Sequence, residues 1–354
     1  MKSRIMSIIA SLMTLLGCNA QSSTTNDGIS VGVDEFEKVI ADMGVVRLDV
    51  RTSEEYLEGH IAQSMNIDVK QPEFEQRALV ALDKSRTVAV YCRSGNRSKK
   101  ACDILVRNGY KVVELNSGIT GWQGAGKPVT KEEVDVFRTD NGTDVFVHCI
   151  KHGTLSINIG NKWIYVDPVT DKVQPVTDFT SMPKADYILV THEHGDHLDA
   201  KAIEQLTKEG TVLIANPRSS EILGGKGDVM KNGDSKDLGA WQIEAVPAYN
   251  ISADKQQFHP KGRDNGYVLT IEGLRIYIAG DTEPIPEMQA IKDIDVAFLP
   301  CNLPFTMTPE QLAEAAKTIN PKVLFPYHYG KTDIQQAQKL LDNSAIDVRI
   351  RQYQ

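Results

Sequence analysis

The sequence predicts an α/β protein made of two domains that follow one another along the chain. Its 354 residues suggest about two domains at roughly 100–200 residues each. Hydrophobic residues make up 41% and charged residues 24%, which is typical of a globular protein. Strand-like apolar runs alternate with helical patterns, which favours layered α/β architecture. We expect the domains at residues 29–128 and 132–354, joined by a short linker.

The N-terminal residues predict export. A basic start is followed by an apolar stretch at residues 5–16, which is shorter than the ~20 residues that span a bilayer and is typical of a signal peptide. The stretch ends in Leu-Leu-Gly-Cys and resembles a bacterial lipoprotein signal over residues 1–18. The resemblance implies a lipid on Cys18, a tether at 19–28 and, because Asn19 follows the cysteine, anchoring to the outer membrane facing the periplasm. Plain secretion with nearby cleavage is the alternative.

The first domain shows an alternating pattern of strands and helices. Strands are expected at 45–50, 87–91 and 112–115, with helices at 34–42, 53–58, 74–81 and 98–108. Such alternation predicts a parallel sheet with both faces covered.

The candidate chemistry of this domain follows the strand at 87–91. The segment reads Cys92-Arg93-Ser94-Gly95-Asn96-Arg97-Ser98 and leads into a helix. Loop amides and the positive end of a helix stabilise an anion, including a cysteine thiolate. Arg93 and Arg97 add positive charge. A buried cysteine before an ordinary turn is the alternative, and it would leave the two arginines unexplained.

The domain resembles the rhodanese family at residues 29–125. The segment at 92–98 matches the family's Cys-Arg-Ser/Thr-Gly-x-Arg-Ser pattern, and further matches are Leu48-Asp49-Val50-Arg51, Glu54-Glu55-Tyr56, Gly59-His60-Ile61, Met65-Asn66-Ile67 and Gly118-Ile119-x-Gly121-Trp122. The resemblance implies that Cys92 takes sulfur from a sulfane-sulfur donor as a persulfide and passes it to a thiol acceptor. It further implies that Asp49 and Arg51 support the loop and that His60 is structural.

The second domain is richer in strands. They are expected at 145–150, 154–159, 162–166, 187–190, 241–246, 266–272, 274–279, 294–299 and 322–325, with helices at 199–208, 309–318 and 333–342. This pattern predicts an α+β or layered α/β core.

The strongest signal in the chain is a cluster of metal-ligand types directly after the strand at 187–190. It reads His192-Glu193-His194-Gly195-Asp196-His197. In extended backbone His192 and His194 point to the same side, and Gly195 is expected to turn the chain so that Asp196 and His197 face a neighbouring position. Histidine and aspartate suit zinc, and paired ions about 3.5–4 Å apart clamp a nucleophile. A histidine-rich loop without a ligand is the alternative.

The cluster is similar to the His-x-His-x-Asp-His motif of the metallo-β-lactamase superfamily. Asp281 in Ala-Gly-Asp-Thr and His328 in Pro-Tyr-His-Tyr follow in the superfamily's order. The resemblance implies an αβ/βα sandwich, Asp281 as a bridging carboxylate, and Asp167 as the acid that orients a ligand histidine. It implies two divalent metal ions, with zinc favoured over manganese or a single iron. Other segments resemble the branch near ascorbate-phosphate lactonases and phospholipase-D-type enzymes.

One position departs from this pattern. The third histidine of the first metal site is expected near residue 250, where the chain has Asn250. We expect His259, in a Gly/Pro-rich loop, to replace it; a weakened first site or a single-metal enzyme are the alternatives. His152, Asn250 and Lys261 are candidates for the substrate side of the site. For His152 a structural role is equally compatible with the sequence, and for Lys261 an exposed charged loop is the favoured interpretation.

These observations predict a metal-dependent hydrolase fused to a sulfurtransferase module. The hydrolase would cleave an ester, lactone or phosphodiester bond of a small molecule with a metal-bound hydroxide, and Asp196 would take part in catalysis. The alternatives are a persulfide dioxygenase with one iron, and a non-catalytic lipoprotein that carries sulfur or metal. The net charge of −8, without a Lys/Arg-rich run, argues against a nucleic-acid partner.

Overall fold

The computed structural model describes residues 28–42, 44–72, 74–131, 134–160, 162–239 and 241–351. The predicted signal segment, with Cys18, and nearly all of the predicted tether lie outside these residues. The chain divides into two compact units, one formed by the chain up to Tyr56 together with Asn66–Pro128, the other by Leu57–Met65 together with the chain from Val129 onward. No helix among the described residues is long and apolar enough to cross a membrane.

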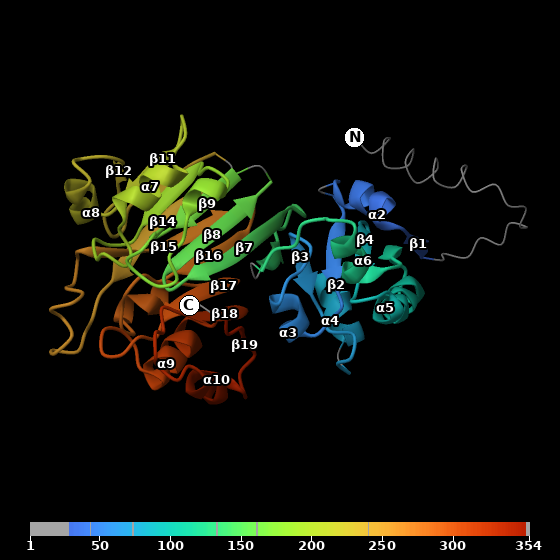
Figure 1. Cartoon of the computed structure of the whole chain (residues 1–354). Helices are drawn as coiled ribbons and strands as arrows, with labels where there is room; N and C mark the ends of the chain where they lie inside the picture. Colours follow the sequence, from blue (N-terminus) through green and yellow to red (C-terminus); the bar gives the residue numbers. More distant parts are fainter. Residues whose placement is uncertain are drawn as a thin grey trace, which may run out of the picture. The chain divides into compact units, whose positions relative to one another are not determined.

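The first unit is built on a five-stranded sheet (Figure 1). Its elements are β1 (Ile29–Val31), α2 (Val33–Ile40), β2 (Val46–Asp49), α3 (Ser53–Leu57), β3 (Ser64–Asn66), α4 (Phe74–Ala81), β4 (Thr87–Tyr91), α5 (Asn96–Arg107), β5 (Lys111–Leu115) and α6 (Gly118–Gly124). The strand order is β1-β5-β4-β2-β3, and β1, β5, β4 and β2 run parallel. The predicted parallel sheet is therefore confirmed.

Two features of this unit differ from the sequence prediction. Helix α5 begins at Asn96 rather than at residue 98, because Gly95 adopts φ +97° and ends the loop two residues earlier. Arg97 consequently lies in the first turn of the helix. The three-residue strands β1 and β3 and helix α6 were not predicted, since such short segments carry too little periodicity.

The second unit contains two seven-stranded sheets. Its elements are β6 (Val134–Arg138), β7 (Asp144–Lys151), β8 (Thr154–Ile159), β9 (Lys162–Val166), η1 (Phe179–Ser181), β10 (Tyr187–Val190), α7 (Ala200–Leu206), β11 (Val212–Ala215), α8 (Pro217–Ile222), β12 (Asp228–Val229), β13 (Ser235–Asp237), β14 (Gln242–Ala248), β15 (Asp264–Ile271), β16 (Leu274–Ile278), η2 (Pro286–Ala290), β17 (Val296–Pro300), α9 (Pro309–Ile319), β18 (Val323–Tyr327), α10 (Gln335–Leu341) and β19 (Asp347–Val348). The strand orders are β12-β11-β10-β9-β8-β7-β6 and β13-β14-β15-β16-β17-β18-β19.

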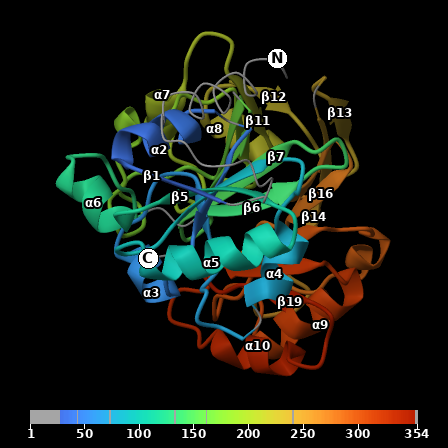
Figure 2. The ribbon, with the colours of Figure 1, turned by 90° about the vertical axis from the view of Figure 1, so that its right-hand side faces the viewer.

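The two sheets pack face to face with helices on their outer sides (Figures 1 and 2). Aliphatic and aromatic side chains from both sheets form the central core, including Ile157, Leu189, Tyr267, Phe298 and Phe325. Helix α7 covers the outer side of the first sheet, and α9 and α10 cover the outer side of the second. This is the αβ/βα sandwich that the sequence predicts.

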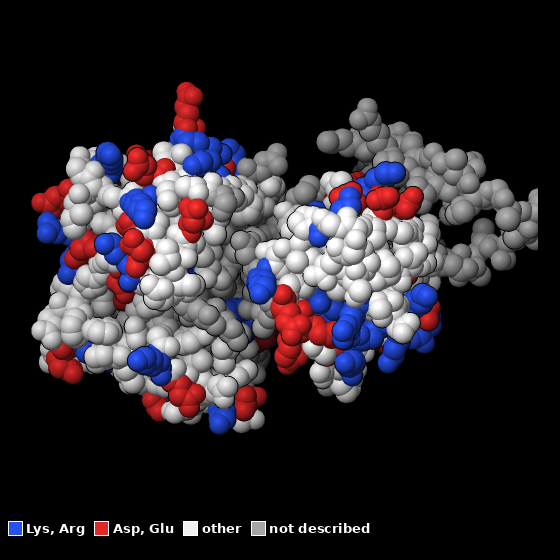
Figure 3. Space-filling view, viewed as in Figure 1, with Lys and Arg blue, Asp and Glu red and all other residues white. Residues whose placement is uncertain are grey.

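The second unit also contains elements that the sequence did not reveal. Strands β6, β11, β12, β13 and β19 and helix α8 were not predicted; most are short or partly exposed, so their apolar pattern is weak. Strand β18 extends to Tyr327, which places His328 immediately after its end. On the face drawn in Figure 3, basic and acidic side chains are interspersed over the second unit.

Candidate metal centre and cysteine loop

The candidate metal ligands of the second unit lie in loops at strand ends. His192, His194, Asp196 and His197 follow β10, and His152 lies in the turn between β7 and β8. Asp281 follows β16 and His328 follows β18, while His259 lies in the loop between β14 and β15. Because β16, β17 and β18 run parallel, their carboxyl ends share one edge of the sheet, which is where ligands bind in sheets of this kind.

These side chains form three overlapping groups among the described residues. The groups are His192/His194/His259, His152/Asp196/His197/His328 and His192/His197/Asp281, and within each group the possible ligand atoms lie within 4.8 Å of one another. Asp281, of the third group, contacts a histidine of each of the other two groups: its Oδ2 is 3.3 Å from His259 Nε2 and 3.5 Å from His328 Nε2. Two adjacent donor sets therefore meet at one carboxylate.

His259 occupies the place that the sequence left open at Asn250. Its Nε2 lies 3.3 Å from Nδ1 of His194, and its ring centre is 5.2 Å from that of His192. The side chain is 1% exposed. The structure thus brings His259 to the two histidines that it was expected to join.

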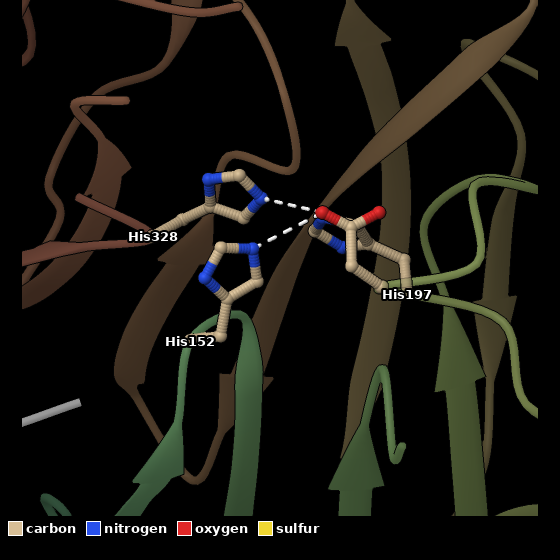
Figure 4. A group of neighbouring side chains, drawn as sticks. His152, His197 and His328 are labelled. Carbon is tan, nitrogen blue, oxygen red and sulfur yellow. Dashed lines mark hydrogen bonds and ion pairs between the residues drawn. The ribbon is translucent and has the colours of Figure 1, made fainter. Parts of the chain in front are cut away.

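His152 lies within the second donor set rather than at its substrate side. Its Nε2 is 3.1 Å from Asp196 Oδ2, and its ring lies 3.7 Å from that of His328. Figure 4 shows the two rings side by side, each with a nitrogen directed at the same carboxylate oxygen. Its candidate role on the substrate side is corrected accordingly.

Asn250 differs from the prediction of a substrate-side role, whereas Lys261 lies in the exposed charged loop that was the favoured interpretation for it. Asn250 is buried, and its side-chain amide donates to the carbonyl oxygens of Lys255 at 3.1 Å and Phe305 at 2.8 Å. Its backbone N–H donates to the carbonyl oxygen of His259, so Asn250 supports the loop that carries this histidine. Lys261 is exposed and its Nζ donates to Glu287 at 2.9 Å, which offsets its charge.

Asp167 orients His197 as the resemblance implied. Nδ1 of His197 donates to Asp167 Oδ2 at 2.7 Å, and the same carboxylate accepts from the backbone N–H and hydroxyl of Thr191. This bond turns Nε2 of His197 toward Asp281 Oδ1, 3.5 Å away. An acid that fixes the outer nitrogen of a ligand histidine is a recurrent feature of metal sites.

The chemistry of the donor set fits divalent cations. Among the described residues, His197 Nε2, His328 Nε2 and Asp281 Oδ1 are buried atoms without a hydrogen-bond partner, although buried polar atoms are normally satisfied. Burial opposes the charged form of His197, but Asp281, Asp196 and Asp167 together raise its pKa to about 10. The carboxylates that hold a proton there equally attract a metal cation.

Three residues of this centre have unusual backbone conformations. His152, Asp167 and His328 adopt φ of 46°, 45° and 49°, a left-handed region that residues other than glycine rarely occupy. Such strain is concentrated at functional sites because the surrounding structure maintains it. The positive φ values of these three residues were not predicted, because the sequence carries no signal for backbone angles at histidine or aspartate.

Two glycines lie at this centre, and a role was expected for Gly195 alone. The chain turns at Gly195 as expected: the backbone N–H groups of His197 and Leu198 donate to the carbonyl oxygen of His194, and Asp196 and His197 belong to the second donor set. The turn does not require glycine, since the φ of Gly195 is not positive and a Cβ added there would meet nothing within 4 Å. Gly153 instead packs against the centre: an added Cβ would lie 2.8 Å from Cε1 of His197. This role of Gly153 has no signal in the sequence, because only the packed structure brings it to His197.

Two buried charges that sequence reasoning missed hold the surrounding loops. The carboxylate of Glu283 accepts from the backbone N–H groups of Ile251 and Ser252 and from Nζ of Lys255, at 2.7–3.0 Å, which fixes the segment before His259. Nζ of the buried Lys151 donates to the carbonyl oxygens of Thr170, Val173 and Pro175 at 2.7–2.8 Å.

In the first unit, the sulfur of Cys92 lies inside the loop that follows β4. Cys92 is 1% exposed, and its Sγ accepts from the backbone N–H of Gly95 at 3.2 Å. Gly95 must be glycine, since a Cβ there would lie 2.1 Å from the carbonyl oxygen of Asn116. The helix α5 begins at the next residue, so the cysteine lies at a helix N-terminus as predicted.

The charged residues of the loop have different surroundings. Arg97 forms a two-point ion pair with Glu55, at 2.5 and 2.6 Å, whereas Arg93 is exposed. The hydrogen bonds of Arg97 lower the pKa of Glu55 to about 2. Asp49 and Arg51 form a buried pair at 2.6 Å. Arg97 is thus largely neutralised by Glu55, whereas the side chain of Arg93 is exposed to solvent.

Comparisons with known proteins agree with both units. Residues 147–328 match the family described as "Beta-lactamase superfamily domain", and residues 32–125 match "Rhodanese-like domain". A UPF0173 metal-dependent hydrolase of Lysinibacillus sphaericus is 32% identical over 212 residues, covering 56% of this chain and 92% of its own. One of Thermococcus onnurineus is 29% identical over 214 residues, covering 57% and 94%.

A solved structure gives the same assignment. A protein of Parabacteroides distasonis described as a metal-dependent hydrolase is 52% identical, with a TM-score of 0.61, and the match covers 63% of this chain and 100% of that chain. The chain therefore belongs to the β-lactamase superfamily. Within it, the chain is a metal-dependent hydrolase fused to a rhodanese-like domain.

Proposed function

We propose that the second unit hydrolyses an ester, lactone or phosphodiester bond of a small molecule with two divalent metal ions. The observation that carries the proposal is the meeting of two donor sets at Asp281. His192, His194 and His259 would hold one ion, and Asp196, His197 and His328, with His152 beside them, would hold the other. Zinc suits this mixture of imidazole and carboxylate ligands, and manganese is the second candidate.

Residues around the proposed metal ligands keep them in position, and one carboxylate is accessible to a substrate. Divalent ions supply Lewis acidity, lowering the pKa of a bound water and polarising a substrate oxygen. Asp167 keeps His197 in one orientation, and the loop held by Glu283 and Asn250 keeps His259 in place. The side chain of Asp196 is 34% exposed, while that of Asp281 is 3% exposed. Asp196 is therefore the more accessible of the two carboxylates to a substrate, and we assign it a part in catalysis on that side of the site.

A panel of model substrates tests this proposal. The full chain, loaded with zinc or with manganese, is assayed with a nitrophenyl ester, a lactone and a nitrophenyl phosphodiester. We expect turnover of at least one class, and its loss in His197→Ala. The exposed residue Lys172 provides a control variant, Lys172→Ala. Equal turnover in wild type and His197→Ala would contradict the proposal.

The completeness of both donor sets favours a hydrolase over a persulfide dioxygenase. A single iron requires two histidines and one carboxylate, and the second set would then have no function. Metal analysis of protein purified from its native host separates these activities. We expect zinc or manganese at about two per chain, whereas iron at one per chain would support the dioxygenase.

For the first unit, we infer that Cys92 carries sulfur as a persulfide. The sulfur lies against a loop amide at a helix N-terminus, where an anion is stabilised. Burial raises the pKa of Cys102 to about 11 and that of Cys301 to about 12, so these thiols stay protonated. Mass spectrometry after incubation with thiosulfate or polysulfide should find the added sulfur on Cys92, and none in Cys92→Ser. Sulfur on Cys102, Cys149 or Cys301 alone would show that the assignment is wrong.

We further propose that the protein is exported and anchored to a membrane through a lipid on Cys18, facing the periplasm. The support is the sequence of residues 1–18 alone. Metabolic labelling with a fatty acid should mark the wild-type protein and not Cys18→Ala. Labelling of both would reject Cys18 as the acceptor.

A further inference from the structure

Cys92, Ser98 and Glu114 form a row of three buried polar groups that ends at the Glu114 carboxylate. Ser98 Oγ is 3.3 Å from Cys92 Sγ and 2.6 Å from Glu114 Oε1. Cys92, Ser98 and Glu114 are 1%, 0% and 1% exposed. Ser98 lies in the first turn of α5 and Glu114 in β5, so elements on either side of the loop hold the row. A carboxylate beside the reacting sulfur has no place in the sulfur transfer described above.

The hydrogen-bond distances indicate the direction in which a proton can move along this row, from Cys92 through Ser98 to Glu114. A serine hydroxyl carries one proton, and a carboxylate oxygen at 2.6 Å is a stronger acceptor than the Gly95 carbonyl oxygen at 3.0 Å. With its proton on Glu114, the Ser98 oxygen presents a lone pair to Cys92 Sγ, which can donate its thiol proton. The second carboxylate oxygen of Glu114 accepts from Ser30 Oγ at 2.6 Å, which holds the group in place.

We propose that Glu114 takes up the thiol proton of Cys92 through Ser98 and stores it while the persulfide exists. Cys92 is nearly closed to solvent, so its proton needs an internal acceptor. Storing the proton leaves one negative charge in the buried site instead of two, which avoids repulsion between a persulfide and a carboxylate. Glu114 acts through Ser98 and touches no substrate; it is a positioning residue for the proton.

The two half-reactions balance. In the first, Cys92 Sγ attacks the outer sulfur of thiosulfate, its proton moves to Ser98 Oγ, and the Ser98 proton moves to Glu114. A new S–S bond forms, and the donor's S–S bond breaks with its electron pair leaving on sulfite. In the second, an acceptor thiolate attacks the outer sulfur of the persulfide. The S–S bond breaks toward Cys92, which recovers its proton from Glu114 through Ser98.

The other titratable groups around the row do not compete for this role. Arg97, on α5, is paired with Glu55, which lies on α3. Cys102, one turn further along α5, has its pKa raised to about 11, first by burial and then by Asp103 and Glu114. Cys102 therefore keeps its proton. Glu114 is the acid that contacts Ser98.

The inference rests on the proposed persulfide chemistry, and rapid-quench mass spectrometry tests both separately. The rate of the first half-reaction is measured with thiosulfate between about pH 6 and pH 10 in the full chain. Glu114→Gln keeps the size and the acceptor oxygen for Ser98 but cannot take a proton. We expect its rate to fall about 100-fold near pH 7 and to recover toward pH 10, where hydroxide removes the proton. Ser98→Ala should behave in the same way.

Lys111→Ala is the control, because Lys111 is the exposed first residue of β5, the strand that carries Glu114; its rate should stay within about threefold. A purely structural role of Glu114 predicts an equal loss at every pH, and a purely repulsive role predicts a faster Glu114→Gln. Either result would overturn the inference. If the wild type takes up no sulfur, the persulfide proposal itself fails.

Infrared difference spectroscopy gives a readout that does not depend on rates or on variant folding. Conversion of the wild-type thiol to the persulfide should produce a protonated-carboxyl band, and Cys92→Ser should produce none. A spectrum without this band, in protein whose mass shows the added sulfur, would show that Glu114 does not store the proton.

Discussion

The cysteine loop of the first unit and the metal centre of the second unit concentrate polar groups in different ways. In the cysteine loop, the sulfur of Cys92, the Gly95 N–H that contacts it and the helix end lie within seven consecutive residues, and Glu114 is added from β5. The metal centre takes side chains from five separate segments of both sheets. A local motif therefore defines the first site, whereas the second exists only when the whole sandwich has formed. Mutations should reveal this difference.

The largest effect is expected from Asp281→Ala. Both donor sets lose their common carboxylate, so metal content should fall and hydrolysis should drop by at least about 1000-fold. Sulfur uptake at Cys92 should not change. Metal analysis, the hydrolysis assay and mass spectrometry measure the three outcomes, with the exposed Asp342→Ala as control. Two bound metals and full hydrolysis in Asp281→Ala would contradict the model of a shared ligand.

A smaller effect is expected from His259→Ala, which removes one ligand of the first set only. Metal content should fall from about two toward one per chain, with affinity at that set reduced by at least about 100-fold. Asn250→Ala should reduce it by about tenfold, since this residue acts through His259. Titration with zinc measures the affinity, and the exposed neighbour Gln257→Ala is the control. Unchanged zinc binding in His259→Ala would exclude it as a ligand.

Two glycine variants compare the effect of an added methyl group at two positions of the metal centre. Gly153→Ala should destabilise the protein by about 1–3 kcal/mol and weaken metal binding, because the new methyl group overlaps the ring of His197. Gly195→Ala should change stability by less than about 0.5 kcal/mol, although it lies within the metal motif itself. Thermal denaturation with and without zinc measures both. A greater loss in Gly195→Ala would contradict the described packing.

The smallest effect concerns the Arg97–Glu55 pair beside the cysteine loop. The folded-state pKa of Glu55 is about 2, below its usual 4.5, so the pair stabilises the fold above pH 4.5 and loses this effect as pH falls toward 2. Glu55→Gln should cost about 0.5 kcal/mol at neutral pH, and the difference from wild type should shrink below pH 4.5. Thermal unfolding as a function of pH measures it, with the exposed Glu58→Gln as control. A difference that persists at pH 2 would contradict the ion-pair explanation.

The local site was the easier to predict from sequence. Strand β4, the cysteine and the following helix are adjacent in the chain, and the structure gives β4 the predicted bounds. The strands that carry the metal loops were also predicted closely, since long apolar runs have a clear pattern; β8, β9 and β10 have the predicted bounds. The αβ/βα sandwich followed from the resemblance.

The remaining errors concern residues whose surroundings are made by distant segments. His152 and Asn250 were expected near the substrate because the neighbouring sequence specifies no partner for either. In the folded chain His152 contacts Asp196. Asn250 donates to the carbonyl oxygens of Lys255 and Phe305. The turn at Gly195 was predicted correctly, but its φ is not positive, so the turn does not depend on glycine at this position. Glu283 and Glu114 gave no signal, since a buried carboxylate cannot be told from an exposed one in a single sequence.

The donor sets draw on both sheets of the sandwich: His152 and the residues after β10 belong to the first sheet, and His259, Asp281 and His328 to the second. An ion held by both therefore links the sheets, and an unfolded chain cannot offer the same ligands. By mass action, above the dissociation constant each tenfold rise in free metal adds about 1.4 kcal/mol to the free energy of unfolding per ion. The lifetime of this unit in its compartment would thus follow the supply of metal there, so that starvation for the ion removes the protein as well as its activity.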